Sequence, residues 1–291
     1  MTTPEPSSTP PRDLTGRTAV ITGANSGIGW STAQAFVQRG AHTVLAVRDT
    51  DKGREAASRL DGSTEVVSLD LAAPASVTRF TQEWGTRPID WLINNAGIST
   101  TDLHRTADGR ELQFATNHLG PFALTTLLLP RITTRIVTVS SMAERRARLD
   151  LDDLDWERRS YNGFQAYANS KQANLLFTAD LQRRLDDAGS SVRALAAHPG
   201  FVATGIYDGT TNPVARLAVR LVAQPPEAGA LPTLHAAFAD LPGDTFTGPR
   251  HLFHMRGGAQ VITRSATAAD PELARGLWEA SERLTGVRFS L

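Results

Sequence analysis

The amino-acid sequence predicts an α/β protein: a single-domain Rossmann fold whose doubly wound, mostly parallel, seven-stranded sheet carries helices on both faces. Short β-branched runs alternate with longer amphipathic stretches, which is typical of parallel strands joined by crossover helices. Several of the short runs are apolar almost throughout, as expected for strands that are buried on both faces. A glycine-rich turn between the first strand and the first helix is the third indication.

The predicted elements follow one another along the chain with short connections. Strands are expected at 17–22, 42–47, 65–69, 89–93, 135–140 and 192–198, with 251–255 as a last strand. Helices are expected at 27–39, 51–60, 75–84, 111–129, 166–185, 226–239 and 271–284. Residues 1–13 are rich in Pro, Ser and Thr and predict a disordered leader, whereas 14–291 predict one domain. The β-α rhythm weakens at 201–224, which we expect to be a loop or substrate lid.

The bulk composition excludes several classes of protein. Lys+Arg and Asp+Glu are both 30 among 291 residues, so no net field attracts nucleic acid or an anionic membrane. Cys is absent, which excludes disulfides, thiolate catalysis and Cys-ligated metal sites. No apolar run reaches the ~18 residues that span a bilayer, and the first dozen residues lack the apolar core of a signal peptide. We therefore expect a cytoplasmic protein that acts on a small molecule, without nucleic-acid or membrane partners.

A glycine-rich loop, from Thr22 to Gly29, follows the first strand and opens the first helix. Gly23, Gly27 and Gly29 allow the backbone to approach a pyrophosphate, and the helix N-terminus offers free N–H groups and the positive end of its dipole. The spacing G-x-x-x-G-x-G is not that of a P-loop, which needs Gly-Lys-Ser/Thr. The loop predicts a dinucleotide site. The other candidate contacts in it are Asn25, Ser26 and Ile28.

The residues at the end of the second strand indicate which of the two nicotinamide cofactors binds. A dinucleotide fold places an acidic side chain there for the ribose 2′-hydroxyl, or a basic one for a 2′-phosphate. Val47 occupies the expected acidic position and Arg48 follows it, which favours NADP(H) over NAD(H) because a guanidinium binds phosphate bidentately. The alternative is that Arg48 is a solvated charge and Asp49 meets the ribose. After the third strand, Asp70 beside Leu71 either accepts a hydrogen bond from the adenine amino group or caps the next segment.

Tyr167 and Lys171 form the most informative pair in the sequence. In the predicted helix 166–185, an i,i+4 spacing places the phenol and the ammonium on one face. A cation ~4 Å away supplies about 4 kcal/mol at an effective dielectric of ~20, enough to lower the usual tyrosine pKa of ~10 to near neutrality. Such a phenol exchanges protons at cellular pH. The alternative is an ordinary exposed helix pair, and the flanking sequence decides between the two.

Several motifs in a fixed order carry a family resemblance: the glycine loop, Asn94-Asn95-Ala96-Gly97, Ser140-Ser141, and Tyr167 with Lys171. In these motifs and their spacing the chain resembles the short-chain dehydrogenases/reductases, over nearly all of 14–291. The sequence Asp153-Leu-Asp-Trp-Glu and the long stretch before Tyr167 are similar to the retinol-dehydrogenase-like branch. Trp30 departs from that branch, whose members often carry a basic residue at this position, near the 2′-phosphate.

The resemblance implies a role for each matching residue. Tyr167 is the general acid/base, Lys171 lowers its pKa and binds the nicotinamide ribose, and Ser141 orients the substrate oxygen. Asn117 supports a water relay to Lys171, or it caps or kinks its helix. Three groups of contacts follow. The cofactor ribose is expected to meet Asn94, Ala96 and Gly97. The nicotinamide carboxamide is expected to meet Pro199, Gly200, Val202 and Thr204, and the substrate pocket is expected to contain Met142, Ala143, Phe201 and Tyr207.

Two further clusters predict no site. His251 and His254 resemble a metal pair, but side chains at i and i+3 of a strand face opposite sides. No Cys and no carboxylate cluster accompanies them, so no metal is expected. The acidic residues between Asp150 and Asp155 lack the glycine and the distal glutamate of a calcium loop. We expect them to form a solvated connector.

The sequence as a whole predicts an NADP(H)-dependent oxidoreductase that interconverts a carbonyl and an alcohol on a lipophilic small molecule. One alternative is a reductase of C=C bonds resembling the protochlorophyllide reductases, although that family carries cysteines at its site and this chain has none. Another is a non-catalytic NADP(H) sensor or scaffold. Family resemblance also implies a homodimer or homotetramer, whereas nothing in the sequence identifies the substrate or the direction of the reaction.

Overall fold

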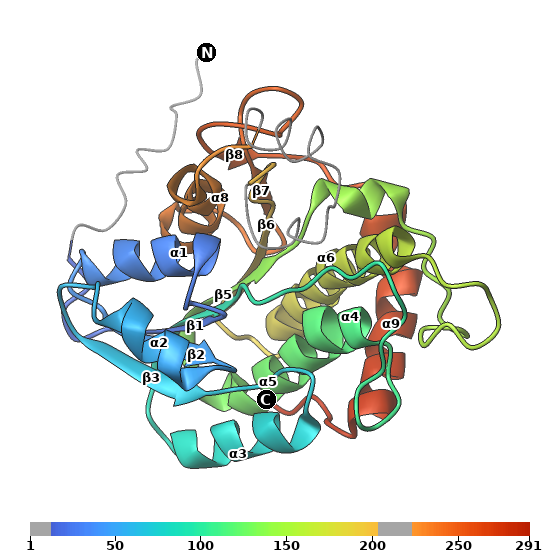
Figure 1. The fold of residues 1–291 in the computed structure, drawn as a ribbon, viewed down its shortest axis with the longest axis horizontal. Coiled ribbons are helices and arrows are strands. Elements are labelled where there is room, and N and C mark those ends of the chain that lie inside the picture. The colour runs from blue at the N-terminus through green and yellow to red at the C-terminus, as the bar shows by residue number, and fades with distance from the viewer. Residues whose placement is uncertain (1–12, 203–222) are drawn as a thin grey trace.

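The computed structural model describes residues 13–202 and 223–291, and its centre is one twisted sheet (Figure 1). The strand order is β3-β2-β1-β4-β5-β6-β7-β8. All neighbouring pairs from β3 to β7 are parallel, and β7 and β8 are antiparallel. The strands are β1 Thr18–Thr22, β2 His42–Val47, β3 Thr64–Ser68, β4 Ile89–Asn94, β5 Ile132–Val139, β6 Arg193–Ala197, β7 Phe246–Gly248 and β8 Gln260–Val261.

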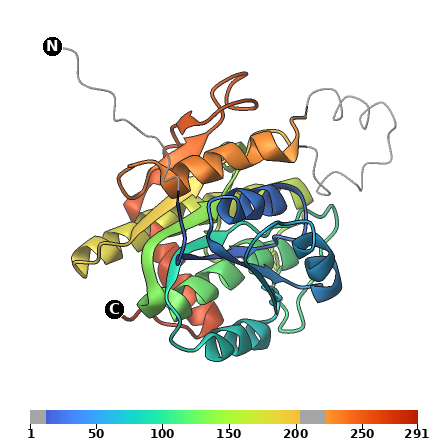
Figure 2. The same cartoon turned by 90° about the vertical axis from the view of Figure 1, so that its left-hand side faces the viewer.

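Helices cover both faces of the sheet (Figure 2). Successive side chains of a strand point to opposite faces, so Val20 packs with α3, α5, α6 and α9, whereas Ile21 packs with α1, α2 and α8. This two-sided burial confirms the doubly wound α/β fold. The helices are α1 Gly27–Val37, α2 Thr50–Ala57, α3 Pro74–Trp84, α4 Leu112–Phe114, α5 Gly120–Leu128, α6 Gly163–Asp187, α8 Pro226–Phe238 and α9 Pro271–Thr285.

The sheet of the described residues has eight strands rather than the predicted seven, because the C-terminal edge was placed wrongly. Residues 251–255 form a turn, in which Leu252, Phe253 and His254 all have positive φ, a conformation incompatible with a strand. The strands lie on either side of this turn. Glycines at both ends of the turn, Gly248 and Gly257, are the sequence signal that favours a hairpin over a strand.

The predicted helix 111–129 is interrupted in the structure. Between α4 and α5 runs a π-helical turn, Ala115–Leu119, which contains Asn117. Gly120 follows this turn, and a Cβ there would overlap the backbone carbonyl of Leu71, which follows β3. A π-turn widens a helix locally and is often found at functional sites, here because it aims one side chain toward the ends of the strands. Apolar periodicity shows that a helix exists but not this change of winding.

The acidic connector between Asp150 and Asp155 is only partly solvated: Asp150 and Asp152 are exposed as expected, whereas Asp153 and Asp155 pack against the body, so the expectation was wrong for these two. Asp153 is buried and accepts hydrogen bonds from the backbone N–H groups of Glu157 and Arg158 at 2.6 and 3.1 Å. Asp155 pairs with Arg110 at 2.7 Å. The carboxylates of Asp153 and Asp155 therefore hold the connector beside α4, through hydrogen-bond donors that the sequence does not reveal.

Two of the predicted segments lie outside the described residues: nearly all of the leader and most of the lid 201–224. Within the described residues, no helix is both long enough and apolar enough to cross a bilayer.

Candidate active site

A cleft of about 630 Å³ opens along the carboxyl ends of the parallel strands. Strand order reverses between β1 and β4, and in open α/β sheets ligands bind where connections diverge in this way. The lining includes fourteen of the predicted cofactor contacts: Gly23, Asn25, Ser26, Gly27, Ile28, Gly29, Arg48, Asp70, Leu71, Ala96, Gly97, Tyr167, Lys171 and Pro199. Four further lining residues belong to motifs or alternatives that the sequence analysis considered: Thr22, Asp49, Asn95 and Ser140. The lining residues that sequence reasoning missed are Ala46, Lys52, Leu69, Ile98, Thr116, Val139 and Pro226.

The glycine loop leaves room for a phosphate group. Gly23 and Gly27 have φ values of 66° and 54°, the left-handed region that favours glycine. A Cβ on Gly29 would overlap the carbonyl of Gly23 and lie 2.5 Å from the Nδ2 of Asn95. Ser26 occupies the N-cap of α1 but makes no side-chain capping bond. The first N–H groups of α1 therefore have no side-chain cap and can donate to an anion, so the loop fits a pyrophosphate.

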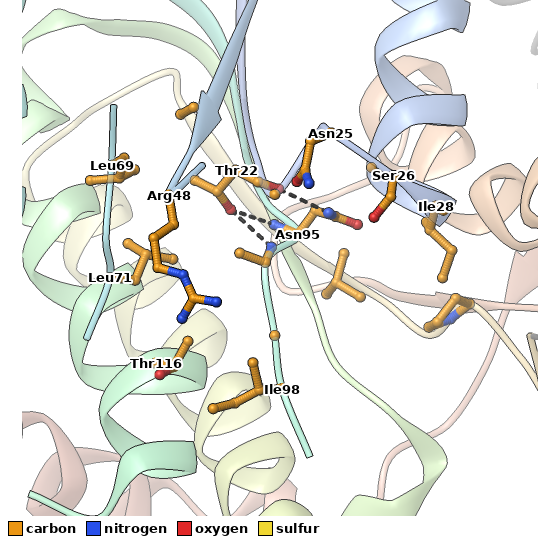
Figure 3. Close-up of a pocket in the computed structure, with 18 of the residues that line it drawn as sticks. Thr22, Asn25, Ser26, Ile28, Arg48, Leu69, Leu71, Asn95, Ile98 and Thr116 are labelled. Atoms are coloured by element: carbon orange, nitrogen blue, oxygen red, sulfur yellow. Dashed lines mark hydrogen bonds between the residues drawn. The ribbon is translucent and has the colours of Figure 1, made fainter. Parts of the chain in front are cut away.

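Hydrogen bonds of Thr22 and Asn95 hold the glycine loop at the end of β4 (Figure 3). The Thr22 hydroxyl accepts from the backbone N–H groups of Asn95 and Ala96 at 3.0 and 2.9 Å, and the Asn95 amide donates to the Thr22 carbonyl at 2.8 Å. Asn94 is buried beneath the cleft instead, where its amide donates to the Thr125 hydroxyl at 2.9 Å. Asn95 rather than Asn94 therefore forms the wall of the cleft, because consecutive residues of a strand face opposite sides.

Two cations line the end of the cleft beside β2. Figure 3 shows Arg48 extending into the cleft, and no acidic partner of its guanidinium is found among the described residues. Asp49 accepts hydrogen bonds from the backbone N–H groups of Asp51 and Lys52 at 3.2 and 3.1 Å, and these bonds hold the pKa of the Asp49 carboxyl below its ordinary value. Asp49 is thus the N-cap of α2. The Lys52 ammonium, which the sequence reasoning missed, is exposed and lies 3.4 Å from the Asp49 carboxylate, so the charges of this pair offset each other.

Asp70 closes the turn after β3, as one of its two predicted roles requires, and its contact with an adenine stays a prediction. One carboxylate oxygen accepts from the backbone N–H of Ala72 at 2.9 Å, so the side chain closes the turn after β3, and the residue also lines the cleft. Leu69 and Leu71 lie on either side of it as apolar walls. Trp30, the departure from the branch pattern, donates its indole N–H to the Ala56 carbonyl at 3.0 Å. Its ring therefore ties α1 to α2.

Tyr167 and Lys171 lie at the other end of the cleft, on one face of α6, as the i,i+4 spacing predicts. The Lys171 ammonium lies 5.6 Å from the centre of the Tyr167 ring and donates to the Val139 carbonyl at 3.1 Å. Lys171 is 3% exposed, and burial lowers its pKa from the usual 10.5 to about 8. A Cβ on Gly97 would lie 3.2 Å from this ammonium, so glycine keeps the space beside it open.

The two serines after β5 have different roles. Ser140 is buried and donates to the Lys171 carbonyl at 2.7 Å, which fixes α6 against the strand. Ser141 is half-buried, and its hydroxyl oxygen accepts from the Ala143 N–H at 3.2 Å. No acceptor for the Ser141 O–H is found among the described residues. Ser141 therefore has a proton that it can offer to a ligand, whereas of the two serines it is Ser140 that lines the cleft.

Asn117 makes three hydrogen bonds from a completely buried position. Its carbonyl oxygen accepts from the Ile98 N–H at 2.8 Å, and its amide donates to the Ile98 carbonyl at 2.9 Å and to the Ser170 hydroxyl at 3.0 Å. It does not line the cleft itself. The side chain instead holds the cleft wall at Ile98 against the helix that carries Tyr167.

The predicted substrate residues lie beside the cleft rather than in its wall. Met142, Ala143 and Phe201 are half-buried and absent from the lining. Met142 packs against the C-terminal core at Phe246 and Ile262. Gly200 and Val202 follow Pro199 behind the wall, where Val202 is buried. Two candidates, Thr204 and Tyr207, lie outside the described residues.

No group of three or more metal-ligating side chains occurs within the described ranges. His254 contacts the Pro249 carbonyl at 3.0 Å, within the turn between β7 and β8.

Comparison with known proteins agrees with this geometry. A profile of the short chain dehydrogenase family matches residues 17–213. Retinol dehydrogenase 13 of Homo sapiens is 37% identical over 296 residues, covering 94% of this chain and 86% of that protein. Dehydrogenase/reductase SDR family member 13 of Bos taurus is 41% identical over 294 residues, covering 94% and 74%.

Two solved structures are similar in fold. The crystal structure of an uncharacterised protein from Mycobacterium paratuberculosis has a TM-score of 0.84 and 48% identity, covering 99% of this chain and 100% of that one. A crystal structure described as an NAD(P)-dependent gluconate 5-dehydrogenase from Beutenbergia cavernae, with NADP bound at low occupancy, has a TM-score of 0.61 and 29% identity. The matched region covers 79% of this chain and 92% of the Beutenbergia cavernae chain. The chain belongs to the short-chain dehydrogenase/reductase family and is an oxidoreductase of its retinol-dehydrogenase-like branch.

Proposed function

We propose that this protein is an NADP(H)-dependent oxidoreductase that interconverts a carbonyl and an alcohol on a lipophilic small molecule. The observation that carries the proposal is the placement of Tyr167 and Lys171 on one face of α6 at one end of the cleft. The opposite end holds a phosphate-sized glycine loop and an unpaired arginine side chain among the described residues. A dinucleotide extended between the two ends would bring its nicotinamide beside the phenol.

The cofactor, when bound, supplies or accepts the hydride. The residues of the chain supply a proton and the position. Tyr167 donates its phenolic proton to the carbonyl oxygen during reduction, or removes the proton of the alcohol during oxidation. Ser141 holds the same oxygen by donating its O–H, and Lys171 stabilises the phenolate form through its charge. Asn117 acts indirectly by keeping Ile98 and α6 in register.

The preference for NADP(H) is supported by three features at the adenosine end. Arg48 lines the cleft and its guanidinium has no acidic partner among the described residues. Lys52 lies beside it. Asp49, the residue that would otherwise bind a ribose 2′-hydroxyl, has its carboxylate engaged at the N-terminus of α2. The unpaired guanidinium, and an aspartate engaged by backbone N–H groups and by the Lys52 ammonium, favour a 2′-phosphate.

A lipophilic substrate is supported by apolar side chains in the cleft and close to the catalytic residues in the sequence. Ile98 lines the cleft, and the half-buried Met142 and Phe201 lie beside it. The similarity to retinol dehydrogenases points to the same class of compound. Long-chain and terpenoid aldehydes, compared with short polar ones, are therefore the first substrates to examine.

Replacing Tyr167 by Phe tests the proposal directly. Wild-type protein should oxidise NADPH in the presence of an aldehyde or ketone from a broad panel, and Tyr167→Phe should lower kcat by ~10²–10⁴, the usual contribution of a general acid/base. Fluorescence titration should show unchanged NADPH affinity in the variant. Full activity in Tyr167→Phe, or tight NADPH binding without turnover of any compound by wild type, would contradict the proposal. The latter result would favour a cofactor sensor, and reduction of an enone at carbon would identify a C=C reductase.

A further inference from the structure

Two buried side-chain amides, one helical turn apart, hold the same stretch of extended backbone. Gln113 in α4 and Asn117 in the π-helical turn are both 0% exposed. Asn117 pairs with the N–H and the C=O of Ile98. In the same way, the Gln113 Oε1 accepts from the Thr100 N–H at 3.2 Å, and its Nε2 donates to the Thr100 carbonyl at 3.3 Å. The two amides thus pair with alternate residues of 98–100, as a neighbouring strand would.

Each amide also reaches α6 at a group that is bonded to Tyr167. Asn117 donates to the Ser170 hydroxyl, which donates to the Tyr167 carbonyl at 2.7 Å. Gln113 donates to the carbonyl of Gly163, the first residue of α6, at 3.1 Å. In an α-helix that begins at Gly163, the same carbonyl accepts the backbone N–H of Tyr167. The carbonyl of Tyr167 is therefore linked to Asn117 through the Ser170 hydroxyl, and its N–H is linked to Gln113 through the Gly163 carbonyl.

The first turn of α6 and the segment 100–101 are closely packed where Gln113 bonds to both. A Cβ on Gly163 would overlap the Thr100 carbonyl and lie 2.9 Å from the Thr101 Cα, so the two backbones already touch. The Gln113 Nε2 also lies 2.7 Å from the Tyr161 phenol, so its two protons are shared among three acceptors, of which the Thr100 carbonyl is the most distant. The Tyr161 phenol in turn donates to Glu111 at 2.9 Å. Burial raises the pKa of Tyr161 to about 12, so the phenol keeps the proton that it donates.

We propose that Gln113 is a positioning residue, which sets the separation between the cleft wall at 98–100 and the first turn of α6 and thereby aims Tyr167 at the substrate oxygen. Gln113 does not itself line the cleft. Its effect passes through backbone to a catalytic side chain, and a displacement of about 1 Å at a reacting group can cost ~100-fold in rate. The geometry is independent of the proposed function, whereas the effect on rate rests on it.

The first experiment compares two buried glutamines. The second glutamine, Gln182, lies in α6 and is 8% exposed. Its Oε1 accepts from the Ala194 N–H at 2.8 Å. Gln182→Leu and Gln113→Leu both remove an amide that satisfies backbone, so both should lower the melting temperature. Only Gln113→Leu should lower kcat, by ~10–100-fold, with the NADPH dissociation constant unchanged within about twofold. Equal kcat in the two variants overturns the proposal.

A second variant gives a readout that loss of stability alone would not produce. In Gln113→Glu, a protonated carboxyl has one donor and one acceptor and can replace part of the amide, whereas the ionised form can no longer donate to Thr100 or Gly163. Measured at a temperature where the variant is folded, kcat should fall as pH rises through the ionisation of the introduced carboxyl. Wild type and Gln182→Glu should lack this step. A profile of Gln113→Glu that parallels wild type overturns the proposal.

Hydrogen exchange separates this inference from the proposed function. Gln113→Leu should speed exchange of the backbone amides in 98–101 and 163–167, whereas Gln182→Leu should affect only the region of Ala194. If wild type turns over no compound, the proposed function fails and exchange alone decides the positioning role. Wild-type protection of 163–167 in Gln113→Leu then overturns it.

Discussion

At its adenosine end, the cleft is walled by loop backbone and by exposed side chains, whereas at its reaction end its wall is held in place by buried side chains from several elements. Arg48 and Lys52 are exposed at the first end and owe their place only to the end of β2 and the start of α2. At the other end, Lys171, Asn117 and Gln113 are 3% exposed or less, and each is bonded to backbone of another segment.

This difference has a physical consequence for substitutions. An exposed cation can be removed without leaving a buried group unpaired, so its loss should change ligand affinity but not folding. A buried polar side chain that satisfies another segment's backbone contributes to both, because its removal leaves donors or acceptors unsatisfied. The two ends should therefore respond differently to the same kind of replacement.

Lys171→Met should give the largest effect. It removes the ammonium beside Tyr167 and should lower kcat/KM by ~10²–10⁴ while weakening NADPH binding. Buried Lys171 has a pKa of about 8, against 10.5 for the exposed group. Between these values the unfolded chain binds more protons, so the contribution of this residue to wild-type stability rises with pH from 8 to 10.5, by at most about 3 kcal/mol.

The variant lacks that contribution, so its stability relative to wild type should decline across the same interval. Urea unfolding of both proteins at several pH values measures this difference. A constant difference from pH 7 to 10.5 would contradict the burial of the ammonium. Lys52→Met, which removes an exposed cation, is the matched control.

Arg48→Gln should give an intermediate effect that is confined to the cofactor. Loss of charge-assisted bonds to a 2′-phosphate should raise KM for NADPH by ~10–100-fold and leave KM for NADH unchanged. The melting temperature should stay that of wild type, because the side chain is exposed. Equal effects on both cofactors would place the guanidinium elsewhere. Arg59→Gln is the control, because Arg59 lies over the Trp30 ring and does not line the cleft.

His118→Leu should give the smallest effect on activity. It extends the comparison to a buried polar side chain. His118 follows Asn117 but points to Ser281 of α9, and burial lowers its pKa to about 3. The unfolded chain binds more protons between pH 3 and 6.5, so wild-type stability should fall as pH drops through this range. The variant should lose less stability in acid and keep kcat within about twofold. The expected readout is the acid midpoint of unfolding, with the exposed His251→Gln as the control.

Most of the fold could be predicted because it depends on local patterns. Alternating apolar runs and turn residues predicted the six central strands within a few residues, and His42–Val47 was predicted at both ends. The C-terminal edge was missed because β7 and β8 are three and two residues long, too short for periodicity. The glycine loop was predictable for a similar reason, since its chemistry belongs to backbone conformations that only glycine adopts easily.

The remainder of the site could not be read in this way. Asn95 rather than Asn94 forms the wall because of which side of the strand each faces. Lys52 enters the cleft because α2 starts immediately after β2. Gln113 had no visible signal, since a glutamine in an amphipathic helix is ordinary until its neighbours are known.

The sequence by itself determined the doubly wound sheet, the dinucleotide loop and the i,i+4 pair of Tyr167 and Lys171, because each of these depends on residues close together in the chain. Only the tertiary structure decided which asparagine side chain lines the cleft, and how the wall at 98–100 meets the helix of Tyr167. Those features depend on hydrogen bonds between residues 13 to 73 positions apart, such as Gln113 with Thr100 and Asn95 with Thr22. Partners so distant are set by packing, and no local pattern encodes them.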